Sequence, residues 1–233
     1  MKRVWVSIAR GVRRVVERLG VDLGRRPGDS RRRIWLKSLL GIYDAQALIA
    51  LDVPWWTFEA AEQVERFLAR RSRARVFEWG SGASSVWLSS RAATVVSIEH
   101  DEAWAQQIAP YLPANVTLRI VRAKAASGPR AVLSRRRGEE GRDFRDYVEA
   151  IDDEEGRFDL VIIDGRAREA CLDHAVGRLA PGGMIVFDNV DRERYRQALD
   201  AHRARLDIDW TRGLTPSLPY PTRTALVRVA ESH

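Results

Sequence analysis

The 233-residue sequence contains a single cysteine, Cys171, and only four histidines. One cysteine excludes an internal disulfide and a zinc site built from several cysteines. No apolar run approaches the ~20 residues that a membrane-spanning helix needs. Arg10, Arg13 and Arg14 interrupt the apolar residues near the N-terminus, so no signal-like core forms there. We therefore expect a cytoplasmic protein, and its 45% hydrophobic and 30% charged residues are typical of a globular domain.

Positive charge is concentrated in the first part of the chain. Residues 1–40 contain twelve Lys and Arg and three acidic residues, whereas the net charge of the whole chain is +7. The rest of the chain is therefore slightly acidic. We interpret residues 1–54 as a basic helical extension and residues 55–233 as one domain.

Apolar residues recur with the period of an amphipathic helix over residues 3–20, and arginines occupy the other side. Such a helix can pack on the domain, pack on a second subunit in a homodimer, or lie on an anionic membrane surface. The sequence leaves these interpretations open. Two further helices are expected, over roughly 31–50 and about 57–71, the second one capped by Thr57.

From Arg75 onward, short apolar runs alternate with helical segments. This pattern indicates a parallel sheet covered by helices on both faces, closed by two strands without a helix between them. We predict an α/β fold of the Rossmann-like, doubly wound type, with a mostly parallel seven-stranded sheet, an antiparallel closing strand and N-terminal helices. The expected strands are 75–79, 94–99, 117–122, 158–164, 183–188, 206–211 and 223–229, and the expected helices lie near 84–92, 101–110, 143–153, 167–179 and 191–204.

Acidic residues and glycines gather where these strands end, and open α/β sheets bind ligands at that edge. The first strand ends in Glu78 and the loop Gly80-Ser81-Gly82, and the second ends in Glu99-His100-Asp101. The fourth ends in Asp164 and the fifth in Asp188-Asn189. Carboxylates without partners are costly to bury, so this concentration indicates a binding site.

The order and spacing of these residues resemble the class I S-adenosylmethionine-dependent methyltransferase family. The residues that resemble it are Glu78-x-Gly80-x-Gly82-x-Ser84, Glu99, the strand 158–164 with Asp164, and Leu179-Ala180-Pro181-Gly182-Gly183. The resemblance runs from about residue 55 to the C-terminus. Ser84 stands where the family usually has its third glycine.

The resemblance implies S-adenosylmethionine as the cofactor and a role for each residue of the set. The methionine part of the cofactor would lie against Gly80, Ser81, Gly82 and Ser84. Glu99 would bind the ribose, His100 would border the adenine, and Asp164 would face the cofactor as well. Glu78 would anchor the amino-acid end of the cofactor, or bond loop N–H groups and hold the turn.

Asp164, Asp188 and Asn189 resemble the metal ligands of catechol-type, cation-dependent O-methyltransferases. Three oxygen ligands from neighbouring strand ends suit Mg²⁺ or Ca²⁺, which would lower the pKa of an acceptor hydroxyl. The chain departs from that family after Asp164, where it has Gly165-Arg166-Ala167-Arg168. Arg166 or Arg168 could pair with the acids and leave no metal, and Asp164 or Asp188 would then be the general base. The predicted catalytic set is Asp164, Asp188 and Arg168.

These observations predict an S-adenosylmethionine-dependent methyltransferase that methylates an oxygen of a small-molecule, glycan or lipid-linked acceptor. The alternative is an RNA methyltransferase or nucleic-acid-binding protein that uses the basic N-terminus and the segment 123–142, which is polar and basic and is expected to form a mobile loop near the ligand edge of the sheet.

Overall fold

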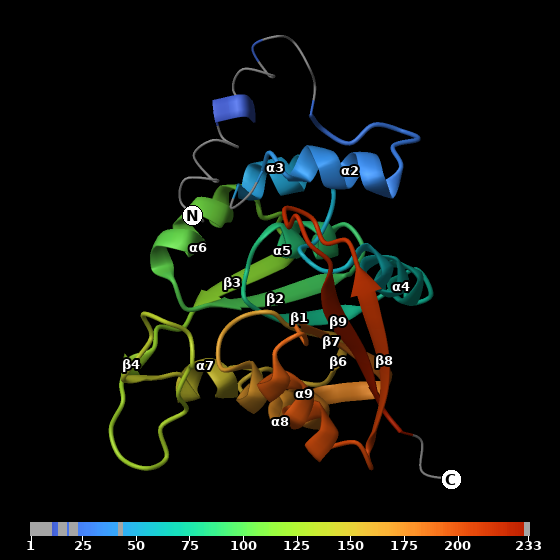
Figure 1. Ribbon diagram of the computed structural model, residues 1–233. Coiled ribbons are helices and arrows are strands. Elements are labelled where there is room, and N and C mark those ends of the chain that lie inside the picture. Colours follow the sequence, from blue (N-terminus) through green and yellow to red (C-terminus); the bar gives the residue numbers. More distant parts are fainter. Residues whose placement is uncertain (1–10, 14–17, 19–22, 42–43, 231–233) are drawn as a thin grey trace.

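A seven-stranded sheet forms the centre of the protein (Figure 1). The computed structural model describes residues 11–13, 18, 23–41 and 44–230. The strands of the sheet are β1 (Arg75–Trp79), β2 (Thr94–Glu99), β3 (Val116–Ile120), β6 (Phe158–Ile163), β7 (Leu179–Asp188), β8 (Leu206–Gly213) and β9 (Thr222–Val229). Their order is β3-β2-β1-β6-β7-β9-β8.

Five neighbouring strands, from β3 to β7, pair in parallel. Strand β9 runs antiparallel between β7 and β8, so the predicted fold class is confirmed. The β7 strand begins at Leu179, earlier than the predicted 183, and its register against β6 shifts where Pro181-Gly182-Gly183 bends the chain. The chain adds strands on one side of β1 and then on the other, which creates a crevice between β1 and β6.

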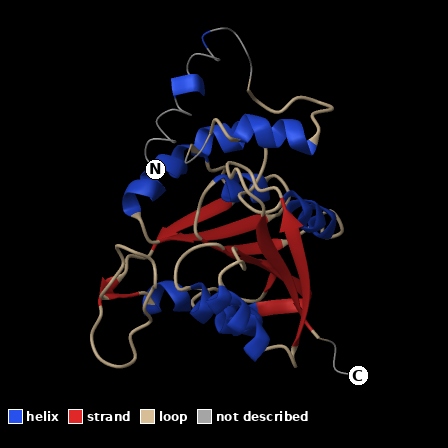
Figure 2. Cartoon of the chain, in the orientation of Figure 1, coloured by secondary structure: helices blue, strands red, loops and turns tan. Residues whose placement is uncertain are grey.

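Helices cover both faces of the sheet, as Figure 2 shows. They are α4 (Phe58–Leu68), α5 (Ala83–Ser89), α6 (Glu102–Ile108), the short η1 (Ala109–Tyr111), α7 (Arg145–Glu149), α8 (Arg168–Arg178) and α9 (Glu193–Ala201). Successive strand residues point to opposite faces: Val76 packs with residues of α4 and α5, whereas Phe77 packs with residues of α7, α8 and α9. Thr57 caps α4 as predicted, since its hydroxyl accepts a hydrogen bond from Ala60 N.

The prediction of a single helix over 31–50 is wrong, because two helices occupy this segment: α2 (Arg31–Ser38) and α3 (Ala45–Ala50). Asp44 starts the second helix, because its side chain accepts from the backbone N–H of Ala47. Both helices pack on the starts of α4 and α5.

Apart from residues 11–13 and 18, the predicted helix 3–20 lies outside the described residues. Its proposed places in a homodimer or on a membrane stay predictions, as does the domain boundary at residue 54.

The segment 123–142 is anchored at its base by a two-stranded ribbon, in which β4 (Lys124–Ala125) pairs antiparallel with β5 (Arg142–Asp143). Figure 1 shows it projecting beside α7. Among the described residues, no helix combines the length and the apolar character that crossing a bilayer requires.

Two fully buried serines connect α2 to the loop before β9. The hydroxyl of Ser38 accepts a hydrogen bond from Ser217 N at 2.8 Å, and Ser217 Oγ donates to the Ser38 carbonyl at 3.1 Å. Ser217 also has a φ of +64°, which is a conformation that needs support from its surroundings.

We expect Ser38→Ala to lower the free energy of unfolding by about 1–3 kcal/mol, because the buried N–H of Ser217 loses its acceptor. Urea denaturation measures the change. Ser90→Ala is the control, since Ser90 is exposed and its hydroxyl bonds, within the described part of the chain, only to the nearby Trp87 and Arg91. Equal effects of the two substitutions would contradict this account.

Candidate active site

A cavity of about 840 Å³ lies at the carboxyl ends of β1, β2, β6 and β7. These strands flank the crevice between β1 and β6, and the volume falls within the roughly 300–1,000 Å³ of small-molecule sites. Most of the predicted site residues line this one cavity: Gly80, Ser81, Gly82, Ser84, Glu99, His100, Asp164, Arg168, Asp188 and Asn189. Glu78 lies directly behind the glycine loop and is fully buried.

Gly80 is required by the packing of the chain itself. Its φ of +98° lies in the left-handed region, and a Cβ here would come within 2.9 Å of the backbone N and Cα of Gly165. A Cβ on Gly165 would in turn overlap the hydroxyl of Tyr147. The loops that follow β1 and β6 therefore touch backbone to backbone.

Gly82 is a glycine for another reason. Its backbone is extended, and the nearest atom to a Cβ at this position is Ser84 Oγ, 4.0 Å away. Gly82 lines the cavity at the start of α5. A side chain here would therefore occupy cavity space without disturbing the rest of the chain.

The carboxylate of Glu78 is held by three serine hydroxyls. Ser84 and Ser85, from the first turn of α5, and Ser97 on β2 donate to it. Burial raises the pKa of Glu78 to about 7, although the three hydroxyls work in the opposite direction. Of its two expected roles, Glu78 does hold the turn, but through side-chain hydroxyls instead of loop N–H groups.

Glu99 fixes the second edge of the cavity. Its Oε2 accepts from Ser81 N and Ser81 Oγ, both at 3.2 Å, and its Oε1 accepts from the backbone N–H groups of His100 and Asp101. Burial acts to raise the pKa of Glu99, but the contacts from His100 and Asp101 outweigh it, so the pKa is lowered and the group is a carboxylate. His100 Nδ1 lies 2.6 Å from the same carboxylate.

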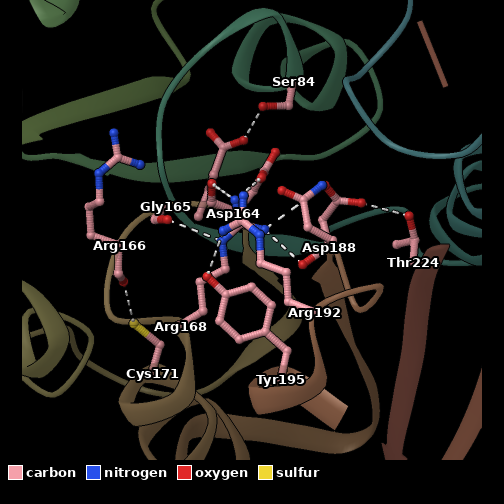
Figure 3. Close-up of polar contacts among 12 residues, drawn as sticks. Ser84, Asp164, Gly165, Arg166, Arg168, Cys171, Asp188, Arg192, Tyr195 and Thr224 are labelled. Atoms are coloured by element: carbon pink, nitrogen blue, oxygen red, sulfur yellow. Dashed lines mark hydrogen bonds and ion pairs between the residues drawn. The ribbon is translucent and has the colours of Figure 1, made fainter. Parts of the chain in front are cut away.

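Arg168 joins the ends of β6 and β7, as Figure 3 shows. Its Nε donates to the carbonyl of Gly165 at 3.1 Å, and its Nη2 donates to both the carbonyl and Oδ1 of Asp164, each at 2.7 Å. Its Nη1 donates to the carbonyl of Asp188 at 2.7 Å and lies 3.9 Å from Asp188 Oδ2. The side chain is 7% exposed. Of the two arginines expected to compete for the acids, Arg168 is the one that pairs with them.

The two acids share this one guanidinium. Burial and the nearby charge of Asp164 together raise the pKa of Asp188 to about 7, although Arg168 opposes both effects. Burial also raises the pKa of Asp164 against the pull of Arg168. The proton bound near pH 7 is therefore shared by Asp164 and Asp188 and is not assigned to either carboxyl group alone.

The arrangement does not fit the predicted Mg²⁺ or Ca²⁺ site. A buried guanidinium already supplies positive charge between Asp164 and Asp188, and a divalent cation beside it would face strong repulsion. Both carboxylate oxygens of Asp188 are also engaged, because it accepts from Thr224 Oγ1 at 2.7 Å and from the amide of Asn189. Within the described ranges, no three His, Cys, Asp or Glu side chains are grouped to hold a metal ion.

Two features of the site have no signal in the sequence. Thr224 links Asp188 to the N-terminus of α4, because Thr224 Oγ1 accepts a hydrogen bond from Thr57 N. Thr57 Oγ1 in turn forms a hydrogen bond with Thr211 Oγ1 at 2.7 Å. Tyr195 on α9 lies under the Arg168 guanidinium, whose carbon is 5.6 Å from the ring centre. Only the fold brings these residues, which are far apart in the chain, to the same place.

Comparison with known proteins agrees with this architecture. Residues 77–190 match a family model described as a methyltransferase domain. Among solved structures, an O-methyltransferase from Bacillus cereus in complex with S-adenosylhomocysteine superposes with a TM-score of 0.58 at 18% identity, covering 99% of this chain and 100% of that one. Residues 77–190 therefore form a methyltransferase domain, and the chain shares the fold of S-adenosylmethionine-dependent O-methyltransferases. The resemblance predicted from the sequence is therefore confirmed.

Other structures show how widely this methyltransferase fold is shared. The O-methyltransferase TomG from Streptomyces achromogenes, involved in tomaymycin synthesis and in complex with S-adenosylmethionine, has a TM-score of 0.55 at 18% identity over 83% of this chain and 90% of that one. An rRNA methylase from Streptococcus thermophilus has a TM-score of 0.50 at 10% identity over 73% and 96%. No curated protein matches the sequence. At these identities the similarity concerns the fold, and the acceptor has to be inferred from the site.

The two glycines of the loop make a matched pair of variants. We expect Gly82→Val to weaken S-adenosylhomocysteine binding about tenfold or more, which is about 1.4 kcal/mol, and to leave the melting temperature unchanged. Gly80→Ala should instead lower the free energy of unfolding by about 1–3 kcal/mol through backbone strain and overlap with Gly165. Calorimetric titration and thermal unfolding measure the two effects. A stable Gly82→Val protein with unchanged affinity would contradict the proposed place of the cofactor.

Proposed function

We propose that this methyltransferase transfers a methyl group to a hydroxyl oxygen of a small-molecule, glycan or lipid-linked acceptor, and that it does so without a divalent cation. The observation that supports this most directly is the Asp164–Arg168–Asp188 cluster, in which a guanidinium takes the place expected for a metal. The similarity in fold to two O-methyltransferases agrees with oxygen as the target.

The cavity fits S-adenosylmethionine, because the open space at Gly82 permits close approach to the start of α5 and Glu99 presents a carboxylate for ribose hydroxyls. We assign the methionine part to Gly80, Ser81, Gly82 and Ser84, with Glu78 behind them as the support of the loop. His100 would border the adenine. When bound, the cofactor supplies a methyl group on a sulfonium, which the acceptor oxygen takes as the carbon–sulfur bond breaks.

Asp164 is the stronger candidate for the general base. Its Oδ1 accepts from Arg168, and the indole N–H of Trp56 is the other side-chain donor directed at this carboxylate. Its side chain is 19% exposed and lines the cavity. Asp164 can therefore receive the proton of an acceptor hydroxyl and pass it to water.

Asp188 and Arg168 have positioning roles in this proposal. Asp188 is almost fully buried, and both of its oxygens are hydrogen-bonded. It holds Arg168 from the side opposite to Asp164. The fixed guanidinium then favours the negative charge that develops on the acceptor oxygen as its proton leaves.

We expect methyl transfer to increase as pH rises through about 7. The pKa of the Asp164–Asp188 pair is raised, so below pH 7 the pair retains a proton and the base is blocked, whereas above pH 7 it is free to accept one. Asp164→Asn should reduce the rate about 10²-fold or more and remove this pH dependence. Transfer of a labelled methyl group to a panel of hydroxylated acceptors, with EDTA present, measures both effects.

Asp159→Asn is a suitable control, because Asp159 lies at the opposite, N-terminal end of β6 and pairs with Arg71. If EDTA abolishes transfer and Mg²⁺ restores it, the metal-free mechanism is wrong. If S-adenosylhomocysteine does not bind at all, the assignment of the cofactor is wrong.

A further inference from the structure

Four arginines line the cavity without a close carboxylate partner: Arg135, Arg136, Arg166 and Arg192. They come from the segment 123–142, the β6–α8 loop and the start of α9. Among the described residues, the only carboxylate within 4 Å of any of these guanidiniums is that of Glu139, 3.9 Å from Arg166 Nε. The side chain of Arg192 instead donates to the hydroxyl of Tyr195 at 3.2 Å.

The acids that line the same cavity are already neutralised or hydrogen-bonded by other groups. Asp164 and Asp188 share Arg168, and Glu169 pairs with Arg194 at 2.9 Å. Glu99 accepts hydrogen bonds from Ser81 and from two backbone N–H groups, and Asp101 accepts one from Trp104 N. Asp191 accepts from the backbone N–H of Arg223 and also pairs with its guanidinium. The lining thus has six arginines and six acids, but each acid already has donors of its own, whereas four of the arginines make no close contact with a described carboxylate.

Arg166 shows most clearly what the lack of a close carboxylate means for these arginines. Burial lowers the pKa of Arg166, and the positive charge of Arg136 lowers it further. Its Nε is buried and makes no hydrogen bond to any described residue. In Figure 3 its guanidinium points away from the Asp164–Arg168–Asp188 cluster. Two like charges held together in this way are unfavourable unless an anion lies between or beside them.

The cofactor brings no net negative charge to these arginines. S-adenosylmethionine has one carboxylate but both an ammonium and a sulfonium, so its net charge near pH 7 is positive. The methionine carboxylate is assigned to the glycine loop, so we look to the acceptor for the anion. This step rests on the function proposed above.

We propose that the acceptor has an anionic group, a phosphate or a carboxylate, that is bound by Arg136 and Arg166 with support from Arg135 and Arg192. Guanidinium groups suit this task because their planar N–H pairs match the oxygens of phosphate and carboxylate. These guanidiniums would also discriminate against neutral analogues of such an acceptor.

A compact acceptor fits better than a nucleic acid. The basic run includes a third arginine, Arg137, which is exposed and does not line the cavity. An extended backbone that binds the run as a charged surface would engage all three arginines alike. Only Arg135 and Arg136 border the cavity, so the geometry favours a single anionic group placed inside it.

The test uses the full-length protein loaded with S-adenosylhomocysteine and two pairs of probes, each differing in one charged group. Glucose 6-phosphate is compared with glucose, and 4-hydroxybenzoate with 4-hydroxybenzyl alcohol, by calorimetric titration at low salt. We expect the charged member of at least one pair to bind about tenfold or more tightly than its neutral partner. The pair that responds distinguishes phosphate from carboxylate.

Arg136→Gln and Arg166→Gln should each remove this preference, whereas Arg137→Gln, the matched control, should keep it. Arg136 is exposed, so its variant is expected to fold normally even if the half-buried Arg166 variant does not. Unchanged S-adenosylhomocysteine affinity in the Arg136 variant shows that the cofactor site is intact.

The proposal is overturned if charged and neutral probes bind equally, if no charged probe binds at millimolar concentration, or if Arg137→Gln weakens binding as much as Arg136→Gln. It is also overturned if an RNA oligonucleotide binds more tightly than both charged probes and depends equally on all three arginines. Failure of S-adenosylhomocysteine to bind the wild-type protein would instead reject the proposed function, so the two failures are distinguishable.

Discussion

The contact on which the site depends most is the one between Arg168 and the two strand-end acids. A buried guanidinium needs acceptors for its N–H groups, and the acids need a counter charge to remain in a low-dielectric place. The backbone carbonyls of Asp164, Gly165 and Asp188 satisfy the remaining donors. The ends of β6 and β7 are thereby fixed relative to each other, and this contact maintains the shape of the crevice.

Much of the fold was predictable because its signals are local. Apolar strands, Thr57 as a helix cap and the glycines after β1 each act within a few residues, and the structure has them where they were expected. The error at 31–50 has a local cause as well. Its apolar residues continue the helical period across a break, and the period alone does not reveal that Asp44 starts a new helix.

The site was predictable only in part, because its partners are distant in the chain. The sequence places Asp164 and Asp188 at neighbouring strand ends and indicates that an arginine could compete for a metal. It cannot show that Arg168 reaches both acids, because that depends on how α8 starts after the loop. The contact of Asp188 with Thr224 depends on β9 lying between β7 and β8, which only the register of the sheet determines.

The backbone contact between Gly80 and Gly165 has an evolutionary consequence. Neither Gly80 nor Gly165 tolerates a side chain while Tyr147 keeps its hydroxyl in place. Substitutions at these three positions are therefore expected to occur together. A homologue with a larger residue at 165 would need a smaller residue in place of Tyr147 and a displaced β1 loop. Correlated changes at 80, 147 and 165 would therefore distinguish subfamilies in which the loops after β1 and β6 are in backbone contact from subfamilies in which they are not.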